Sequence, residues 1–183
     1  MSIELISLAV TVFLAFIGFV AAYWNNLRIA KRQERLELIN KRIGEFYGPL
    51  YIANQAGARA YRTLVRKLNK KKAVFADETG PPTEKDLAEW RIWLKHVFMP
   101  NNEIIENLIM KKAYLIQEED MPECLLEFIT HVSVYKAVLS KWEGGDFTES
   151  LSIVDFPTEI GKYASDSYRQ LKAKQLKLIG KLK

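Results

Sequence analysis

The sequence predicts an all-α protein with a single amino-terminal transmembrane helix that continues into a stalk and then into a cytoplasmic helical bundle. Two observations support this fold class: an uncharged run near the amino terminus, and apolar residues that recur every three or four positions along most of the remaining chain. No alternating strand pattern of useful length appears in the sequence. The predicted domains are a short flank (1–4), a transmembrane helix (5–24), a stalk helix (25–47) and a helical bundle (48–183).

The predicted transmembrane helix, 5–24, carries no charged side chain. At 1.5 Å per residue it would cover roughly 30 Å as a helix, about the thickness of the hydrocarbon core of a bilayer. A cleaved signal peptide is one alternative, but the residues before the run lack a positive charge and no small-residue cleavage site follows it. A buried core helix is another alternative, although globular helices rarely stay apolar on every face.

The charges beside this run predict its orientation. Four basic residues follow it and none precedes it, so the positive-inside rule places the carboxy-terminal part of the chain in the cytoplasm. Tyr23 and Trp24 would lie at the membrane interface, where aromatic side chains are enriched. Cys124 is the single cysteine, which excludes an intrachain disulfide and agrees with a reducing compartment.

Small residues along one face of the span are followed, in register, by a heptad pattern in the stalk. Small residues let two helices approach closely in lipid, and apolar heptads favour a coiled coil. We therefore predict a homo-oligomer, with the alternative that the stalk part of this face packs on later helices of the same chain. The predicted self-association seam consists of Thr11, Ala15, Gly18, Ala22, Ile29, Leu36, Ile39 and Ile43.

The motif from Tyr47 to Leu50 must bend or end the stalk helix, because Pro49 lacks a backbone donor and disfavours helical geometry at Gly48. A kink is favoured over a hairpin because no polar loop residues surround the proline. A hairpin would return the following basic residues to the lipid headgroups, whereas a kink would carry them away from the bilayer. The predicted basic patch for lipid or a partner consists of Arg28, Lys31, Arg32, Arg35, Lys67, Lys70, Lys71 and Lys72.

A linker at 73–82 precedes the remaining predicted helices. Thr83 with Asp86 resembles a helix-start cap, and an apolar stripe at helical spacing follows it. Pro122 opens a later helix, because proline is favoured in the first helical turn, and Gly144-Gly145 ends that helix.

Met99-Pro100 predicts a second break in the helical structure. Asn101 and Asn102 follow it and can cap a new helix with their side chains. The last helix is predicted from Pro157 towards Lys183 and becomes rich in lysine. The long connection before it contains several apolar residues, which predicts that it packs against the bundle.

Charge is segregated along the chain. Residues 28–72 contain thirteen Lys or Arg and three Glu, residues 73–161 contain seven basic and seventeen acidic residues, and residues 162–183 contain seven basic residues and one Asp. Clustered cations can bind nucleic acid, but no recognisable nucleic-acid-binding fold accompanies them, so nucleic acid is not an expected partner. The expected partners are the lipid bilayer, a second copy of the chain and another protein, and no small-molecule ligand can be identified.

No catalytic, cofactor or metal motif appears in the sequence, so we predict no catalytic residue, no cofactor and no metal site. The best enzymatic alternative is Glu127 with His131, which fall on neighbouring turns of one predicted helix. Because His131 lies in line with Phe128 and other apolar residues, a hydrogen-bonded core histidine is favoured over a catalytic one.

Four short motifs are spread over most of the chain: Tyr47-Gly48-Pro49-Leu50, Phe98-Met99-Pro100, His131 with Tyr135, and Trp142-Glu143-Gly144-Gly145-Asp146-Phe147. Through these motifs the chain resembles a family of bacterial, membrane-anchored, all-helical proteins. The resemblance implies a single-pass protein of the bacterial inner membrane, and it carries no activity across.

The continuous seam, together with the lack of a chemical motif, predicts a protein that works by binding. The leading hypothesis is a membrane-anchored cytoplasmic adaptor or sensor module that self-associates and is not an enzyme. One alternative is an effector that perturbs the membrane in bacterial stress or phage defence, because the span has a small and partly polar face. A second alternative is an enzyme that uses the Glu127 and His131 pair.

Overall fold

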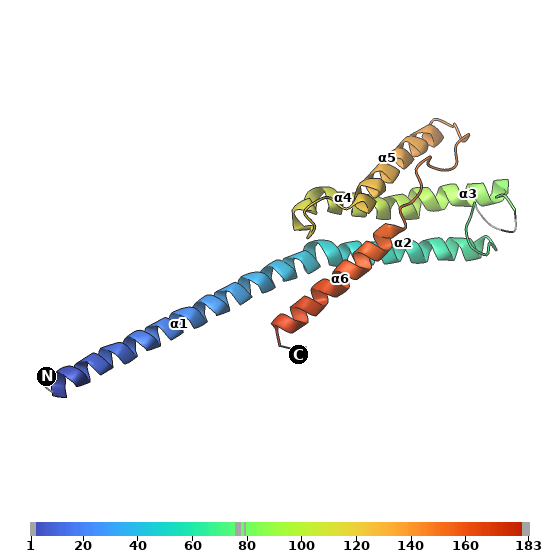
Figure 1. Ribbon diagram of the computed structural model, residues 1–183. Helices are drawn as coiled ribbons and strands as arrows, with labels where there is room; N and C mark the ends of the chain where they lie inside the picture. The colour runs from blue at the N-terminus through green and yellow to red at the C-terminus, as the bar shows by residue number, and fades with distance from the viewer. Residues whose placement is uncertain (1–2, 76–77, 79, 181–183) are drawn as a thin grey trace. The chain divides into compact units, whose positions relative to one another are not determined.

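The computed structural model describes residues 3–75, 78 and 80–180, and these residues form helices, turns and loops without a β-strand (Figure 1). The α-helices are α1 (Ile3–Arg42), α2 (Gly48–Lys67), α3 (Glu84–Trp93), α4 (Met99–Lys112), α5 (Glu123–Glu143) and α6 (Glu159–Leu178). Turns of other helical types are η1 (Ile43–Tyr47), η2 (Leu94–Phe98) and η3 (Ala113–Leu115). The predicted all-α class and the long apolar amino-terminal helix are confirmed. Parts of the predicted flank (1–2), linker (76, 77 and 79) and last helix (181–183) lie outside the described residues.

The chain divides into two compact units. The amino-terminal unit comprises residues 1–40 together with 174–183, and the central unit comprises residues 41–173. Most of α1 and the carboxyl end of α6 therefore belong to the amino-terminal unit, although they lie at opposite ends of the sequence.

Within the amino-terminal unit, the carboxyl end of α6 is hydrogen-bonded to the stalk part of α1. Arg32 Nε donates to the Leu178 carbonyl at 2.7 Å, and Gln175 Nε2 donates to Asn40 Oδ1 at 2.6 Å. The later residue of α6 contacts the earlier residue of α1, so the two helices run in opposite directions here. Because Leu178 is the last residue of α6, the Arg32 guanidinium also places a positive charge at the negative end of the helix dipole.

The central unit is built on an antiparallel pair, in which α2 packs against the continuous segment formed by α3, η2 and α4 (Figure 1). Near the middle of the pair, Asn101 Nδ2 donates to the Ala53 carbonyl at 3.2 Å. Near one end, Lys112 Nζ lies 2.6 Å from Glu45 Oε2. Early residues of one helix thus contact late residues of the other, which defines the antiparallel direction.

The remaining helices of the central unit cover this pair. α5 packs on α4, and the first part of α6 lies beside α2, where the Tyr51 and Tyr168 rings stack with their centroids 5.2 Å apart. Each of these helices buries a stripe of apolar side chains, as helical spacing predicts. Fully buried examples are Phe46, Leu50, Leu64, Ile105, Ile109, Leu125, Phe128 and Ile160.

Pro49 neither ends the helix nor reverses the chain. The backbone continues from α1 through η1, a five-residue π-helical turn, directly into α2. The Gly48 N–H donates to the Ile43 carbonyl five residues earlier, and Pro49 then falls in the first turn of α2, where no backbone donor is needed. A hairpin is therefore excluded at this point, and a change of helix type takes the place of a loop.

Met99-Pro100 is accommodated in the same way, so the predicted helix break there is wrong. η2 is a second five-residue π-helical turn, and Pro100 falls in the first turn of α4. Asn101 and Asn102 therefore do not cap a new helix. The Asn101 amide instead donates to the Ala53 carbonyl of α2, and the Asn102 side chain is buried.

The predicted ends of two other helices are correct. α3 begins with a capping box, in which the Asp86 N–H donates to Thr83 Oγ1 at 3.2 Å and the Thr83 N–H donates to Asp86 Oδ2 at 2.9 Å. α5 ends just before Gly144. Gly145 follows with a φ of 84°, a left-handed conformation that favours glycine.

The connection between α5 and α6 is held mainly through its backbone. Ring N–H groups donate to three of its carbonyls: Trp142 to Glu149 at 2.7 Å, Trp90 to Ser150 at 2.9 Å and His131 to Val154 at 2.8 Å. The predicted burial of its apolar side chains is realised only in part, since Ile153 is 90 % exposed and Phe147 and Phe156 are also exposed.

Candidate membrane-anchoring site

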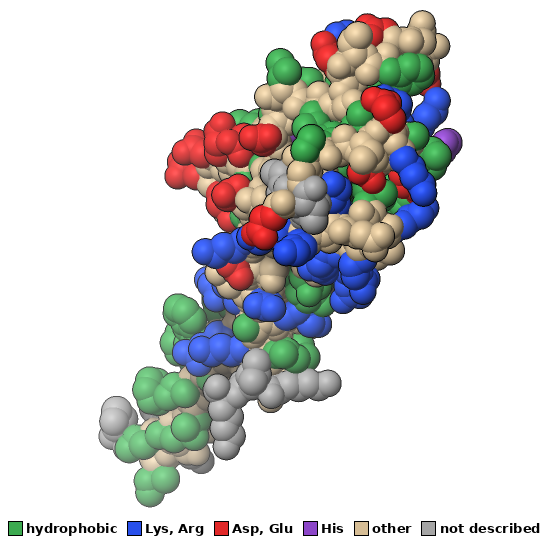
Figure 2. Space-filling model, turned by 90° about the vertical axis from the view of Figure 1, so that its right-hand side faces the viewer, with side chains coloured by type: hydrophobic (Ala, Val, Ile, Leu, Met, Phe, Trp, Pro, Cys, Tyr) green, Lys and Arg blue, Asp and Glu red, His purple; other side chains and the backbone are tan. Residues whose placement is uncertain are grey.

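One helix among the described residues is long and apolar enough to cross a membrane, and its apolar part is the beginning of α1. None of the 18 residues in its most apolar stretch is buried. Phe13, Phe16 and Phe19 are 62 %, 63 % and 70 % exposed. Figure 2 shows hydrophobic side chains gathered on this part of the chain, with Lys and Arg side chains following them. Exposed apolar area of this kind is unfavourable in water by roughly 25 cal/mol per Å² and has no such cost in lipid.

A polar side chain in the middle of this segment is satisfied within the helix. Thr11 Oγ1 donates to the Ser7 carbonyl, one turn earlier, at 2.9 Å. The backbone groups are paired by the helix itself, which is the condition that hydrocarbon imposes on any spanning segment. At Gly18, no heavy atom lies within 4 Å of the position that a Cβ would take. The small-residue face around it is therefore open to lipid or to another helix.

Aromatic and basic side chains follow the apolar segment. Tyr23 and Trp24 are exposed, as are Arg28, Lys31 and Arg35. In the described part of the chain, none of these three cations lies within 4.0 Å of a carboxylate oxygen. This order of apolar, aromatic and basic groups is the one found at the cytoplasmic end of membrane spans.

The predicted self-association seam is open from Thr11 to Ile29 and partly covered from Leu36 to Ile43. Its exposed residues are Thr11, Ala15, Gly18, Ala22 and Ile29, and its half-buried residues are Leu36, Ile39 and Ile43. Arg32 and Asn40, which contact α6, lie on the same face of α1 as Leu36 and Ile39. The carboxyl end of α6 thus lies along this part of the stalk, which is the alternative packing expected from the sequence. Self-association itself stays a prediction.

The predicted basic patch falls into two groups that belong to different units. The first, Arg28 to Arg35, lies in the amino-terminal unit, and the second, Lys67 to Lys72, lies in the central unit at the far end of α2 from η1. Because the chain does not reverse at Pro49, the hairpin that would return the second group to lipid headgroups does not form. The second group forms ion pairs instead: Lys67 with Glu89, Lys70 with Asp86, and Lys71 and Lys72 with Glu78.

Lys70 and Asp86 form the least exposed of these pairs, with Nζ and Oδ2 3.8 Å apart. The Thr83 N–H that donates to the Asp86 carboxylate lowers its pKa, and the positive charge of Lys70 lowers it further. Lys70 Nζ also donates to the Gly80 carbonyl at 3.3 Å. These contacts fix the linker to the start of α3, which is a structural role.

His131 is buried in an aromatic cluster, with its ring centroid 4.9 Å from that of Tyr135 and 5.4 Å from that of Phe156. Since a carbonyl only accepts, Nδ1 carries the proton and donates to Val154. Burial lowers the pKa of His131, so the ring is held neutral. Glu127 is exposed on α5 and forms no hydrogen bond to the ring among the described residues. This is the arrangement of a hydrogen-bonded core histidine.

Sequence reasoning missed a buried tyrosine network. Tyr47 in η1 is fully buried, and its hydroxyl accepts from the Gln117 N–H at 3.0 Å and lies 3.1 Å from the Tyr163 hydroxyl. Tyr163 in turn donates to Glu118 Oε2 at 3.0 Å. Burial raises the pKa of both tyrosines, which keeps them neutral and unsuited to act as bases. The network joins η1, the connection before α5, and α6.

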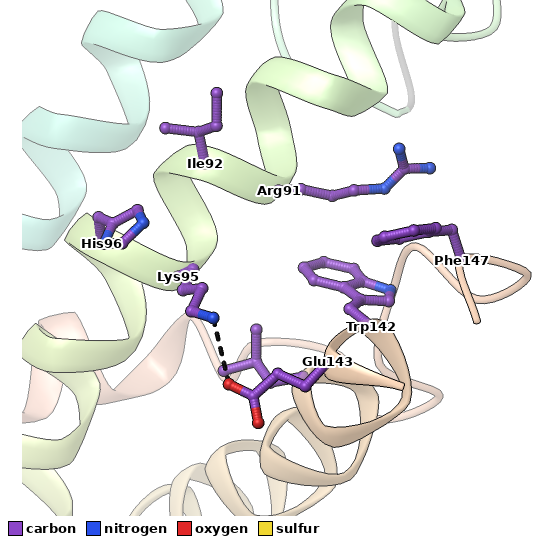
Figure 3. A pocket seen from close by; sticks show the side chains of 8 residues that line it. Arg91, Ile92, Lys95, His96, Trp142, Glu143 and Phe147 are labelled. Atoms are coloured by element: carbon purple, nitrogen blue, oxygen red, sulfur yellow. Dashed lines mark hydrogen bonds and ion pairs between the residues drawn. The ribbon is translucent and has the colours of Figure 1, made fainter. Parts of the chain in front are cut away.

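A shallow groove of about 260 Å³ lies between the helices that carry Arg91 and Trp142 (Figure 3). Across it, Lys95 Nζ and Glu143 Oε1 form an ion pair at 3.1 Å. The Arg91 guanidinium lies 4.8 Å from the centroid of the Phe147 ring. The groove is smaller than the roughly 300–1,000 Å³ of most small-molecule sites, and two of the charged groups that line it, Lys95 and Glu143, pair with each other.

His, Cys, Asp and Glu side chains are the usual protein ligands of metal ions, and a cysteine thiolate can act as a nucleophile. In the described part of the chain, no three His, Cys, Asp or Glu side chains are placed to share a metal ion. Cys124 is half-buried, and burial raises the pKa of its thiol. A reactive cysteine needs the opposite shift, because the thiolate is the nucleophile.

No protein-family model matches the chain, and no curated protein or solved structure matches it. The resemblance to bacterial membrane-anchored helical proteins therefore stays a prediction. The features that bear most directly on function are those of the chain's own exposed apolar helix and of the basic residues beside it.

Proposed function

We propose that this chain is a membrane-anchored helical module that functions by binding. Residues 6–24 of α1 would lie in the bilayer, and the central unit would form a helical bundle on the cytoplasmic side. One observation carries the proposal: the most apolar stretch of the chain is also a stretch in which no side chain is buried. A folded protein in water does the reverse, since its most apolar segments form its core.

The transfer of this segment from water to lipid is strongly favourable in free energy. Burying one Val, Leu or Phe side chain away from water is favourable by about 1.5–3 kcal/mol. Five such side chains would together gain on the order of 10 kcal/mol on entering lipid. These five are Leu8, Val12, Phe13, Phe16 and Phe19, all of them exposed. This gain requires only that the side chains enter lipid, and no other part of the chain has to cover them.

The orientation and the self-association are further parts of the proposal. Exposed Arg28, Lys31 and Arg35 support a cytoplasmic location for the part of the chain after the span. Self-association would use the open part of the seam, from Thr11 to Ile29, because the end of α6 lies along the stalk beyond it. The central unit would then be the part that meets a protein partner in an adaptor or sensor.

A pair of matched double substitutions tests the anchoring. Val12 and Phe16 are 61 % and 63 % exposed, and Ile52 and Ile104 in the central unit are 67 % and 60 % exposed. In water, arginine at either pair of positions would be tolerated equally. In lipid, each arginine near the centre of a span costs about 2.5–3.5 kcal/mol, so only V12R/F16R should lose membrane insertion.

The measurement is the fraction of full-length protein that stays with membranes after alkaline carbonate extraction. We expect the wild type and I52R/I104R to stay in the membrane fraction and V12R/F16R to be released or degraded. Equal retention of both double variants would contradict the anchoring, as would a wild type found mainly in the soluble fraction.

A further inference from the structure

The carboxyl end of α6 is fixed beside the part of α1 that follows the apolar segment. The Arg32 guanidinium donates to the Leu178 carbonyl through both Nε and Nη2. The Gln175 amide donates to Asn40 on the same face of the stalk. These contacts lie within one compact unit. Cations from the two ends of the sequence are thereby brought into the same unit.

The position of Arg32 along α1 places this contact close to the membrane surface in the proposed anchored state. Arg32 follows Trp24 by eight residues, which is about 12 Å along a helix. The polar headgroup layer accounts for roughly 5–8 Å of this distance. The Debye length in physiological salt is about 8 Å, so charges at the level of Arg32 interact with the headgroups.

Basic groups outnumber acidic groups among the described side chains of this unit. The basic residues are Arg28, Lys31, Arg32 and Arg35 of α1 with Lys174 and Lys177 of α6, and the acidic residues are Glu34 and Glu37. Lys177 is exposed and directly precedes Leu178, which accepts from Arg32. Ile179, the next residue along, is also exposed. The last turn of α6 and the residue that follows it therefore expose a cation and an apolar side chain, two kinds of group suited to the membrane interface.

We infer that the last turn of α6 is a second lipid-contacting element, which binds anionic phospholipid headgroups together with the basic residues just after the span. The inference rests on the proposed anchoring of residues 6–24. A zwitterionic headgroup carries no net charge, so this surface distinguishes anionic from zwitterionic lipid. Lys177 contributes more than Lys174, because Lys174 lies about one turn farther from the Arg32 contact.

The test measures lipid selectivity around the full-length protein. The protein is reconstituted into mixed bilayers of phosphatidylglycerol and phosphatidylcholine, and electron paramagnetic resonance of spin-labelled copies of each lipid gives their relative association. We expect a preference for phosphatidylglycerol that Lys177→Gln lowers by up to about fivefold, the factor that corresponds to about 1 kcal/mol per basic residue near an anionic surface. Lys174→Gln lowers it less, and added salt weakens it in the wild type.

Lys111→Gln is the matched control, since Lys111 is an exposed lysine of the central unit and its replacement changes the net charge equally. It should leave the preference unchanged. An unchanged preference in Lys177→Gln, or an equal decrease in Lys111→Gln, would overturn the inference. If these variants still insert normally into the bilayer, the anchoring itself is not contradicted. Failure of the wild type to insert into either bilayer would overturn the anchoring and the inference with it.

Discussion

Residues 6–24 of α1 and the helix α5 are both rich in apolar side chains, but those of α5 are largely buried on one face and those of residues 6–24 are largely exposed. In α5, Phe128 and Leu125 are fully buried while Lys136 and Glu143 are exposed, so the helix has a buried apolar face and a solvent-exposed polar face. Residues 6–24 contain no charged residue, and none of their most apolar stretch is buried. The comparison shows that apolar content alone does not predict burial. A helix packs in a core when it also has a polar face to give to water.

The same substitution made in each region would sharpen this comparison most strongly. Phe128→Ala should lower the free energy of unfolding of the central unit by about 3–5 kcal/mol, because the ring is fully buried and meets the Phe156 ring at 5.7 Å. Phe13→Ala, at a residue 62 % exposed, should change it by no more than about 0.5 kcal/mol. Denaturant unfolding in mild detergent, followed by tryptophan fluorescence, measures both. Equal losses would show that Phe13 packs against protein.

A matched pair of tyrosines extends the comparison to hydrogen bonding. Tyr47→Phe removes a buried hydroxyl that accepts from the Gln117 N–H and lies beside Tyr163. Because Gln117 and Tyr163 both keep a hydrogen bond to Glu118, the loss should be that of the hydrogen bonds alone, about 0.5–1.5 kcal/mol. Tyr23→Phe, at an exposed residue, should be neutral within about 0.5 kcal/mol. The shift in denaturant midpoint in the same detergent reports both. A neutral Tyr47→Phe would mean that the network contributes nothing to the stability of the central unit.

The smallest expected effect is a pH dependence confined to the central unit. Burial lowers the pKa of His131 below its ordinary 6.5, so below that pH the unfolded chain binds a proton that the folded chain does not. Stability should therefore fall as the pH drops from about 6.5 towards the lower pKa of His131 in the folded protein. His131→Gln should flatten this part of the profile, whereas substitution of the exposed His96 by Gln should keep it. A profile that stays the same in His131→Gln would contradict this assignment.

The features that could be predicted from the sequence are those that depend on composition and local spacing. The all-α class followed from helical periodicity, and the exposed apolar segment followed from a run without charge. The capping box at Thr83 could also be predicted, because both of its partners lie within one helical turn. Local patterns of this kind need no knowledge of the tertiary structure.

The two π-helical turns could not be predicted in this way. A proline after an apolar stretch ordinarily indicates the end of a helix, which is the correct expectation when nothing else holds the segments in line. Here η2, which precedes Met99, and α4, which contains Pro100, both pack on α2, and Asn101 bonds to Ala53 across 48 residues of sequence. Tertiary packing therefore decides that the chain changes its hydrogen-bond spacing and does not break.

The same limit applies to the candidate site. Its apolar segment and the basic group from Arg28 to Arg35 were predicted from order along the chain. The contact of Arg32 with Leu178 spans 146 residues, and that of Tyr47 with Tyr163 spans 116. No periodicity or motif relates residues so far apart, so the participation of α6 became visible only in the folded chain.

The π turn η1 also limits how far a superhelix could extend along α1. Its hydrogen-bonded rings hold one residue more than those of an α-helix, so it shifts the angular phase of all later side chains by about 100°. Residues at heptad spacing along α1 therefore no longer share one face of the helix after Ile43, which is the first residue of η1 and the last position of the predicted seam. Even without the end of α6, which already covers the seam beyond Ile29, supercoiling between neighbouring copies would stop at this residue, and α2 would pair within its own chain.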